Sequence, residues 1–349
     1  MANGANYTDA EIDELVSHVL ALRKDYVQQL LSGAGIPYSG FRKNELRGRV
    51  REAIADGRLT VEGVVEFLDR VEPGGKQHVF LLRPSGALNN SWRDAVAMRR
   101  RLAREVATRD LLAAPLPLLM PEELQLSSVR LADGVVEVTG VEARRYTERD
   151  ESYDRTAVTE EGLPVQLRAF VERVARSTIV LRWDTATRHA ALHITQATGR
   201  GLERDHYRRV ADRCGSAVDS FLDFSEFRDV NLHRVIHELG QREKANRNVL
   251  TRSRRGSWDT PNGAELRATS ASTAASVYSD RRLSAAIGQV ADAGTGQAGN
   301  VYWLPGGNGS PLSEELHLTI VASDSRVHFM VPSSTEIVQY VVGQIRRLL

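Results

Sequence analysis

The spacing of the apolar residues changes near residue 76, and this change limits the folds that the chain can adopt. Over residues 8–72, apolar side chains recur at intervals of three and four, as they do on the buried face of a helix. The turn "EPGGK" ends this pattern, and beyond it strand-like segments are mixed with helical ones. Because regular alternation of strand and helix is missing, the sequence predicts an α+β fold and not a doubly wound sheet.

These patterns divide the 349 residues into three parts. We expect a helical domain at 1–73, a mixed α/β domain at 77–246, and an antiparallel β-rich segment at 247–349. The last part ends in a helix and is expected to pack on the preceding domain. A chain of this length has room for two or three domains of about 100–200 residues each.

Local signals mark several element boundaries. Thr8 and Glu11 have the spacing of a helix-capping box, and Asp133-Gly134 is a pair that favours a hairpin turn. Hydrophobic periodicity predicts further helices at 91–113, 162–176, 203–222 and 225–246, and strands within 177–195. Ser91 is the expected cap of the first of these helices. A terminal helix is also expected, with a capping box at Ser333 and Glu336.

The overall composition is that of an ordinary globular protein, with 42% hydrophobic and 26% charged residues. The apolar runs are far shorter than the roughly 20 residues that cross a bilayer, and no secretory signal opens the chain. The single cysteine, Cys214, excludes an intrachain disulfide framework, and we expect it in the apolar core. We therefore expect a soluble, cytoplasmic protein with no membrane partner and no cofactor.

Arginine dominates the basic residues, since only four of the 46 are lysines. This bias is typical of a GC-rich bacterial genome, and the net charge is only +1, so local clusters alone can indicate a nucleic-acid site. One such cluster, Arg99, Arg100 and Arg104, lies on the helix expected at 91–113. It is interpreted equally well as a DNA-contacting stripe or as a solvated helix face.

The second cluster follows the turn in "GIPYSGFRKNELRGRV". Within residues 26–54, two leucines lead to a glycine, then Ile36-Pro37, Ser39-Gly40 and a basic pair. The segment resembles a SAP domain, a small helical module that holds DNA, although Gly40 and Leu46 are one residue further apart than in the family. The resemblance implies backbone contacts with double-stranded DNA, without sequence preference, at the start of a helix. The candidate DNA-binding residues are Ser39, Gly40, Arg42, Lys43, Arg47, Arg49 and Arg51.

Other motifs are weaker. His233 and His237 have the four-residue spacing of metal ligands on a helix, but Glu238 follows them, so we expect a structural role. "GTGQAG" at 294–299 matches a dinucleotide fingerprint, but a helix precedes it and a strand follows, so we interpret it as a loop. Trp258 is expected in a loop with basic neighbours, where it could stack on a base or fold back onto its own domain.

Taken together, the sequence predicts a SAP-like helical module followed by a mixed body with an antiparallel sheet and a C-terminal helix. The leading hypothesis is a non-enzymatic DNA-binding adaptor with a protein partner, such as a nucleoid-associated subunit of a bacterial DNA-handling or phage-defence complex. Two alternatives stay open. One is a divergent metal-dependent nuclease, with Glu137, Glu142 and Asp184 as candidate carboxylates. The other is a protein-assembly subunit that docks through its helical module.

Overall fold

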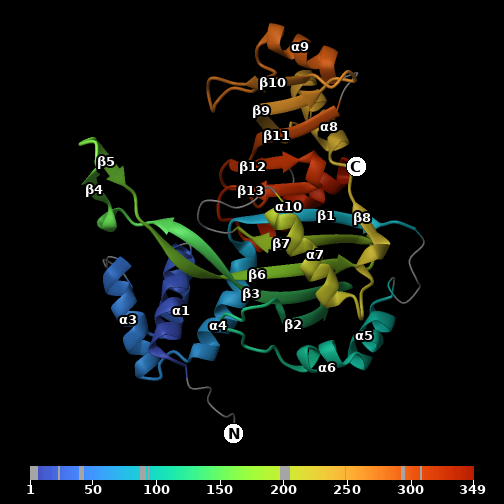
Figure 1. Cartoon of the computed structure of the whole chain (residues 1–349). Helices are drawn as coiled ribbons and strands as arrows, with labels where there is room; N and C mark the ends of the chain where they lie inside the picture. The colour runs from blue at the N-terminus through green and yellow to red at the C-terminus, as the bar shows by residue number, and fades with distance from the viewer. Residues whose placement is uncertain are drawn as a thin grey trace.

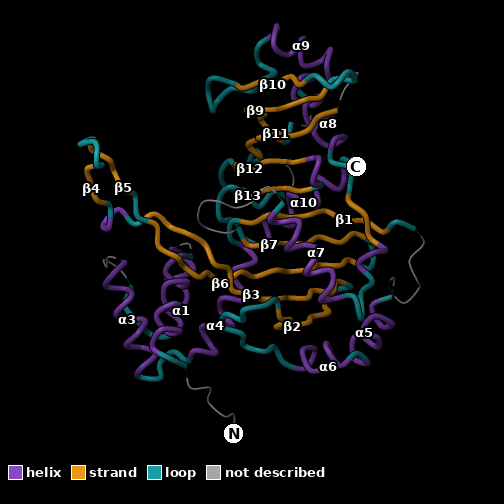
Figure 2. Tube along the Cα trace, in the orientation of Figure 1, coloured by secondary structure: helices purple, strands orange, loops and turns teal. Residues whose placement is uncertain are grey.

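The computed structural model describes residues 7–22, 24–38, 43–86, 92, 94–196, 205–247, 249–291, 295–306 and 309–349. Within these residues, the chain forms an N-terminal group of helices beside one large antiparallel sheet that carries helices on both faces (Figures 1 and 2). The predicted α+β class is therefore confirmed.

The N-terminal part contains the helices α1 (Asp9–Ala21), α2 (Lys24–Gly33), α3 (Lys43–Ala55) and α4 (Val61–Val71). Their apolar faces meet in a core of their own, with Leu15, Leu31 and Leu68 fully buried at its centre. The predicted capping box is confirmed. The Thr8 hydroxyl accepts from the Glu11 amide at 3.3 Å, and the Glu11 carboxylate accepts from the Thr8 amide at 2.7 Å.

The main sheet has the strand order β10-β9-β11-β12-β13-β1-β7-β6-β3-β2, and β8 pairs with the end of β1. Its strands are β1 (Gln77–Pro84), β2 (Gln125–Ala132), β3 (Val135–Arg149), β6 (Phe170–Asp184), β7 (His189–Thr195), β8 (Phe227–Asp229), β9 (Thr251–Asp259), β10 (Glu265–Thr269), β11 (Thr295–Trp303), β12 (Leu316–Val321) and β13 (Arg326–Phe329). Because β1 pairs with both β7 and β13, the parts expected at 77–246 and 247–349 share a single sheet.

Alternating side chains of β1 define the two faces of this sheet. Phe80 and Leu82 enter a core with α5 (Ala95–Arg104) and α7 (His206–Val218), and we call this side the α7 face. Val79 and Leu81 enter a second core with α8 (His233–Ala245) and α10 (Thr335–Arg347), on the α10 face. The helix α9 (Arg281–Ala291) packs against β9 and β10 around the buried Trp258.

A long β arm leaves the body at one side. Strands β3 and β6 stay paired from Val135 and Asp184 to Arg149 and Phe170, and a small sheet of β4 (Arg155–Val158) and β5 (Pro164–Leu167) forms the tip (Figure 1). The helix predicted at 162–176 is therefore wrong. Its periodicity was ambiguous. Pairing of β5 with β4 and of β6 with β3 satisfies its backbone groups as two strands.

Several other boundaries differ from the predictions. The helix expected at 91–113 is broken at Glu105, which has extended backbone angles, into α5 and α6 (Val106–Ala113). Asp94 caps α5, its carboxylate accepting from the Val96 amide at 2.9 Å, whereas the predicted cap Ser91 lies outside the described residues. The terminal helix is capped by Ser334, one residue after the predicted Ser333.

The glycine-rich motif at 294–299 is also not the loop that we expected. From Thr295 it forms β11, against which α8 packs closely, since a Cβ at Gly296 would lie 2.9 Å from a methyl group of Ile236. Trp258 lies on β9, where its side chain is buried and cannot stack on a base. Cys214 is buried on α7, as predicted.

Candidate nucleic-acid interface

One half of the α7 face has no described helix over it. Helix α7 lies over the strands from β1 to β3, and β9, β11, β12 and β13 lie beyond it (Figure 1). Burial alternates along these strands, so that Leu316, Leu318 and Ile320 are buried while His317 and Thr319 are partly exposed. This uncovered surface, the open sheet face, consists of Arg252, Arg254, Asn300, Tyr302, His317, Thr319, Arg326 and His328.

Cationic and aromatic groups alternate across the open sheet face. The guanidinium of Arg252 lies 5.2 Å from the ring centroid of Tyr302, and the Tyr302 ring stacks on His317 with centroids 4.8 Å apart. His317 is held in place by Asn300, whose Oδ1 lies 2.7 Å from its Nε2. Burial, together with the charge of Arg254 at the β-bulge of β9, lowers the pKa of His317.

Where the open sheet face meets α7, it ends in a stack of rings. His78 lies between His328 and Tyr207, with centroids 4.0 and 3.7 Å away. Arg326 extends over Tyr207 and places its Nη1 3.3 Å from His78 Nδ1. Burial and these neighbouring cations lower the pKa of His78 to about 2 and that of His328 to about 4, so both rings are neutral near pH 7.

The acidic groups next to this surface are already bound. Glu315 forms a two-bond ion pair with Arg252, and Asp324 pairs with Arg326 at 3.0 Å. Arg254 has no acidic partner among the residues that the structure describes. These pairs also neutralise Arg252 and Arg326, so the surface has one positive charge in excess, that of Arg254.

The SAP-like segment is only partly described. Ser39, Gly40 and Arg42 lie outside the described residues, as does the Lys43 side chain. Of the predicted residues that the structure describes, Arg49 is partly exposed, whereas Arg47 and Arg51 turn towards α1. Arg51 pairs with Asp13 at 2.9 Å, and Arg47 reaches the carbonyl of the same residue at 3.5 Å. These two arginines hold α3 against α1, which reduces their availability to a phosphate.

The other predicted cluster is on the surface. Arg99, Arg100 and Arg104 are exposed on α5 and have no acidic partner in the described part of the chain, while Arg101 lies over the Trp92 ring at 5.3 Å. Figure 1 shows α3 and α5 on opposite sides of the molecule. The two clusters predicted from the sequence therefore do not form one continuous surface.

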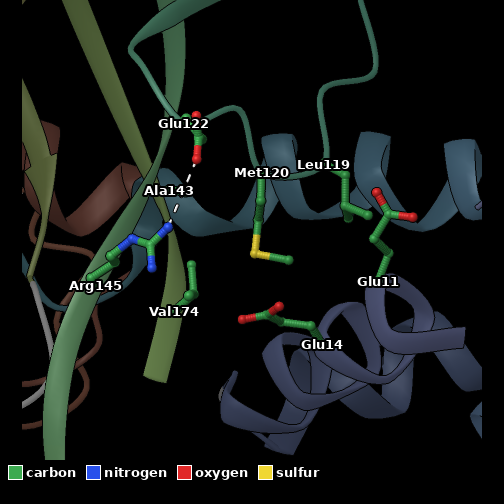
Figure 3. Close-up of a pocket in the computed structure, with 8 residues that line it drawn as sticks. All are labelled: Glu11, Glu14, Leu119, Met120, Glu122, Ala143, Arg145 and Val174. Carbon is green, nitrogen blue, oxygen red and sulfur yellow. Dashed lines mark ion pairs between the residues drawn. The ribbon is translucent and has the colours of Figure 1, made fainter. Parts of the chain in front are cut away.

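A pocket of about 390 Å³ lies where α1 meets the sheet (Figure 3). Met120 and Glu14 point into it, and Glu122 and Arg145 form a 3.7 Å ion pair at its edge. Burial raises the pKa of Glu14. With Glu11 also in its lining, the pocket is too acidic to suit a phosphate.

The metal-site and nuclease candidates are not brought together. His233 binds the Gly296 carbonyl through Nδ1 at 2.5 Å, and His237 is exposed further along α8. Glu137 and Glu142 point to opposite faces of β3, where each is bound by arginines, and Asp184 accepts amides in a turn. Among the described residues, no three histidine, cysteine, aspartate or glutamate side chains gather where a metal could bind.

The open sheet face could not be predicted from the sequence, because its residues come from strands far apart in the chain. The alternation in "EELHLTIVASDSRVHFMV" was the available signal, since it predicts strands with one polar face.

Comparisons with protein-family models and with characterised proteins find no match to this chain. None of the described helices combines the length and apolar character that a membrane span requires.

Proposed function

We propose that the protein is a non-enzymatic DNA-binding adaptor that holds the DNA backbone without sequence preference. The observation that carries this proposal is the open sheet face, an uncovered sheet surface where cations and aromatic rings alternate and the nearby acids are already paired. Such a surface suits the backbone of a DNA duplex, because its cations attract the phosphates. The exposed arginines of α5 would add phosphate contacts.

The β arm supports the adaptor part of the proposal. Its tip exposes large apolar side chains that no described segment covers: Tyr153, Val158, Leu163, Leu167 and Phe170. Exposed apolar clusters of this kind often mark contacts with other proteins. The same observation favours a second candidate function, a protein-assembly subunit that does not bind DNA.

Fluorescence anisotropy with a short duplex of random sequence tests the DNA-binding proposal. We expect affinity to fall steeply with salt, because each phosphate neutralised contributes a slope of about −0.9 in log K against log salt. The variant Arg252→Ala/Arg254→Ala should reduce this slope by about one to two units and weaken binding at every sequence tested. Arg99→Ala/Arg100→Ala/Arg104→Ala should reduce it independently.

The matched control is Arg281→Ala/Arg282→Ala, which removes two exposed arginines from α9. Equal losses in this control would mean that only total charge matters, and the open sheet face would not be the contact surface. Arg42→Ala/Lys43→Ala tests the SAP resemblance separately. If the wild type does not bind at low salt, the assembly function takes precedence, whereas Mg²⁺-dependent cleavage of a plasmid would make the protein a nuclease.

A further inference from the structure

A second pocket, of about 610 Å³, lies between β3 and α7 on the α7 face. Its lining includes Glu142 and Arg144 of β3 together with His206 and Arg213 of α7. We infer that this pocket binds a phosphate group, and that Arg144, His206 and Arg213 hold the phosphate oxygens. This inference goes beyond DNA binding, since the ligand need not be a polymer.

Arg144 is the main reason for the inference. The residue is only 7% exposed, and two of its three guanidinium nitrogens are bound within the protein. Its Nε donates to Glu142 at 2.8 Å, and its Nη1 donates to the Thr195 carbonyl at 3.1 Å. Its Nη2 is buried without a hydrogen-bond partner among the described residues. A buried cationic donor left unpaired is costly. Nη2 has almost no exposed surface, so a phosphate oxygen would reach it only when the side chains around it shift.

His206 adds a second unsatisfied position in the same pocket. Its Nε2 is buried and has no partner among the described residues. Burial and the charge of Arg144 lower the pKa of His206, so the ring is neutral near pH 7. A neutral imidazole with a proton on Nε2 can donate to a phosphate oxygen.

Two buried or half-buried arginines surround one carboxylate in the pocket. Glu142 accepts from both Arg144 Nε and Arg213 Nη2, the latter at 2.8 Å. The whole described lining is balanced, with Arg144, Arg145 and Arg213 against Glu122, Glu123 and Glu142. Glu122 and Glu123 are exposed, so water screens their charges more strongly than those of the buried pair. Arginine forks suit the oxygens of a phosphate group.

Two sources could supply this phosphate: a small phosphate monoester or the 5′-terminal phosphate of a DNA strand. The volume of the pocket lies within the range of about 300–1,000 Å³ that is usual for small-molecule sites. A pocket of this size could hold the phosphate and part of the group attached to it. The two sources are distinguished by titrating the protein with a probe for each.

Isothermal titration calorimetry of the full chain with inorganic phosphate tests the inference without DNA. We expect binding with a Kd of about 1 mM or tighter, weakened about tenfold or more in Arg144→Gln and Arg213→Gln. Arg213→Gln keeps the test valid if loss of the buried Arg144 disturbs folding, because Arg213 is half-exposed. The control Arg281→Gln makes the same charge change at an exposed position of α9, outside the pocket lining, and should bind like the wild type.

Absence of phosphate binding by the folded wild type, or an equal loss in Arg281→Gln, would overturn the inference. Two further titrations identify the source. Tighter binding of AMP than of adenosine supports a small monoester, and tighter binding of a 5′-phosphorylated duplex than of its 5′-hydroxyl form supports a DNA end. Because inorganic phosphate alone decides the main question, failure of the DNA-binding proposal would leave this test unaffected.

Discussion

Replacing Arg176 with alanine is expected to lower the free energy of unfolding by about 3–5 kcal/mol, the usual cost of leaving buried charges without their partner. The Arg176 side chain is fully buried on β6 and binds the carboxylates of Asp69 and Glu72. Its Nε donates to the Leu119 carbonyl at 3.0 Å, and its backbone amide donates to His18 Nε2 at 2.7 Å. One residue therefore joins the N-terminal helices to the sheet.

The physical reason for the loss is the two carboxylates that the substitution leaves behind. Burial raises the pKa of Asp69, and the Arg176 charge opposes that rise. Without the guanidinium, the buried carboxylates of Asp69 and Glu72 lose their cationic partner, so they must gain water or the helical part must separate from the sheet. Each of these outcomes costs stability.

Urea unfolding followed by circular dichroism measures this effect. The control Arg145→Ala removes an arginine of the arm whose ion pairs are exposed, and it should change stability by less than about 1 kcal/mol. Combining Arg176→Met with Asp69→Asn and Glu72→Gln should recover part of the loss, because no unpaired charge remains. A loss for Arg176→Ala as small as that of the control would show that the ion pairs do not fasten the helical part.

Lowering the pH below about 6 is expected to destabilise the fold steeply through its buried histidines. Burial lowers the pKa of His78 to about 2, that of His193 to about 3 and that of His328 to about 4, whereas an unfolded histidine titrates near 6.5. Between these values the unfolded chain binds more protons than the folded one. Stability is therefore complete above pH 6.5 and decreases as the pH falls, by about 1.4 kcal/mol per pH unit for each such histidine.

The same urea experiment, repeated in steps from pH 7.5 to the acid limit of the folded state, measures the slope. His328→Gln should reduce the slope by about 1.4 kcal/mol per pH unit. Without this histidine, the unfolded chain binds one proton fewer in excess of the folded chain. His237→Gln, an exposed position on α8, should leave it unchanged. A stability that stays level from pH 6.5 to 5 would contradict neutral, buried histidines.

The parts of the fold predicted correctly are those specified by neighbouring residues. The capping box at Thr8 and the turn at Asp133-Gly134 need only a few adjacent residues, and both are present, with positive φ angles at the turn. The segment 162–176 was predicted wrongly because its state depends on pairing with two other strands, β4 and β3. The identity of a pairing partner leaves little trace in the periodicity of the segment itself.

The candidate sites follow the same rule. The α5 arginines are consecutive in the sequence, so they could be predicted, and the structure places them on the surface. The open sheet face joins Arg252, Tyr302 and His317 across neighbouring strands, and no local motif connects them. The unpaired Nη2 of Arg144 could not be predicted either, because it depends on which of its neighbours already use the other guanidinium nitrogens.

The position of β1 at the centre of the sheet has a consequence for synthesis on the ribosome. One edge of β1 pairs with β7, more than a hundred residues further along the chain. The other edge pairs with β8 at one end and, at the other, with Arg326–Phe329, near the end of the 349 residues. Until that last segment emerges, residues 77–80 of β1 keep an unpaired edge, which invites pairing with other chains. A nascent chain of this kind depends on chaperones or rapid completion, and truncation before β13 should send the protein into aggregates.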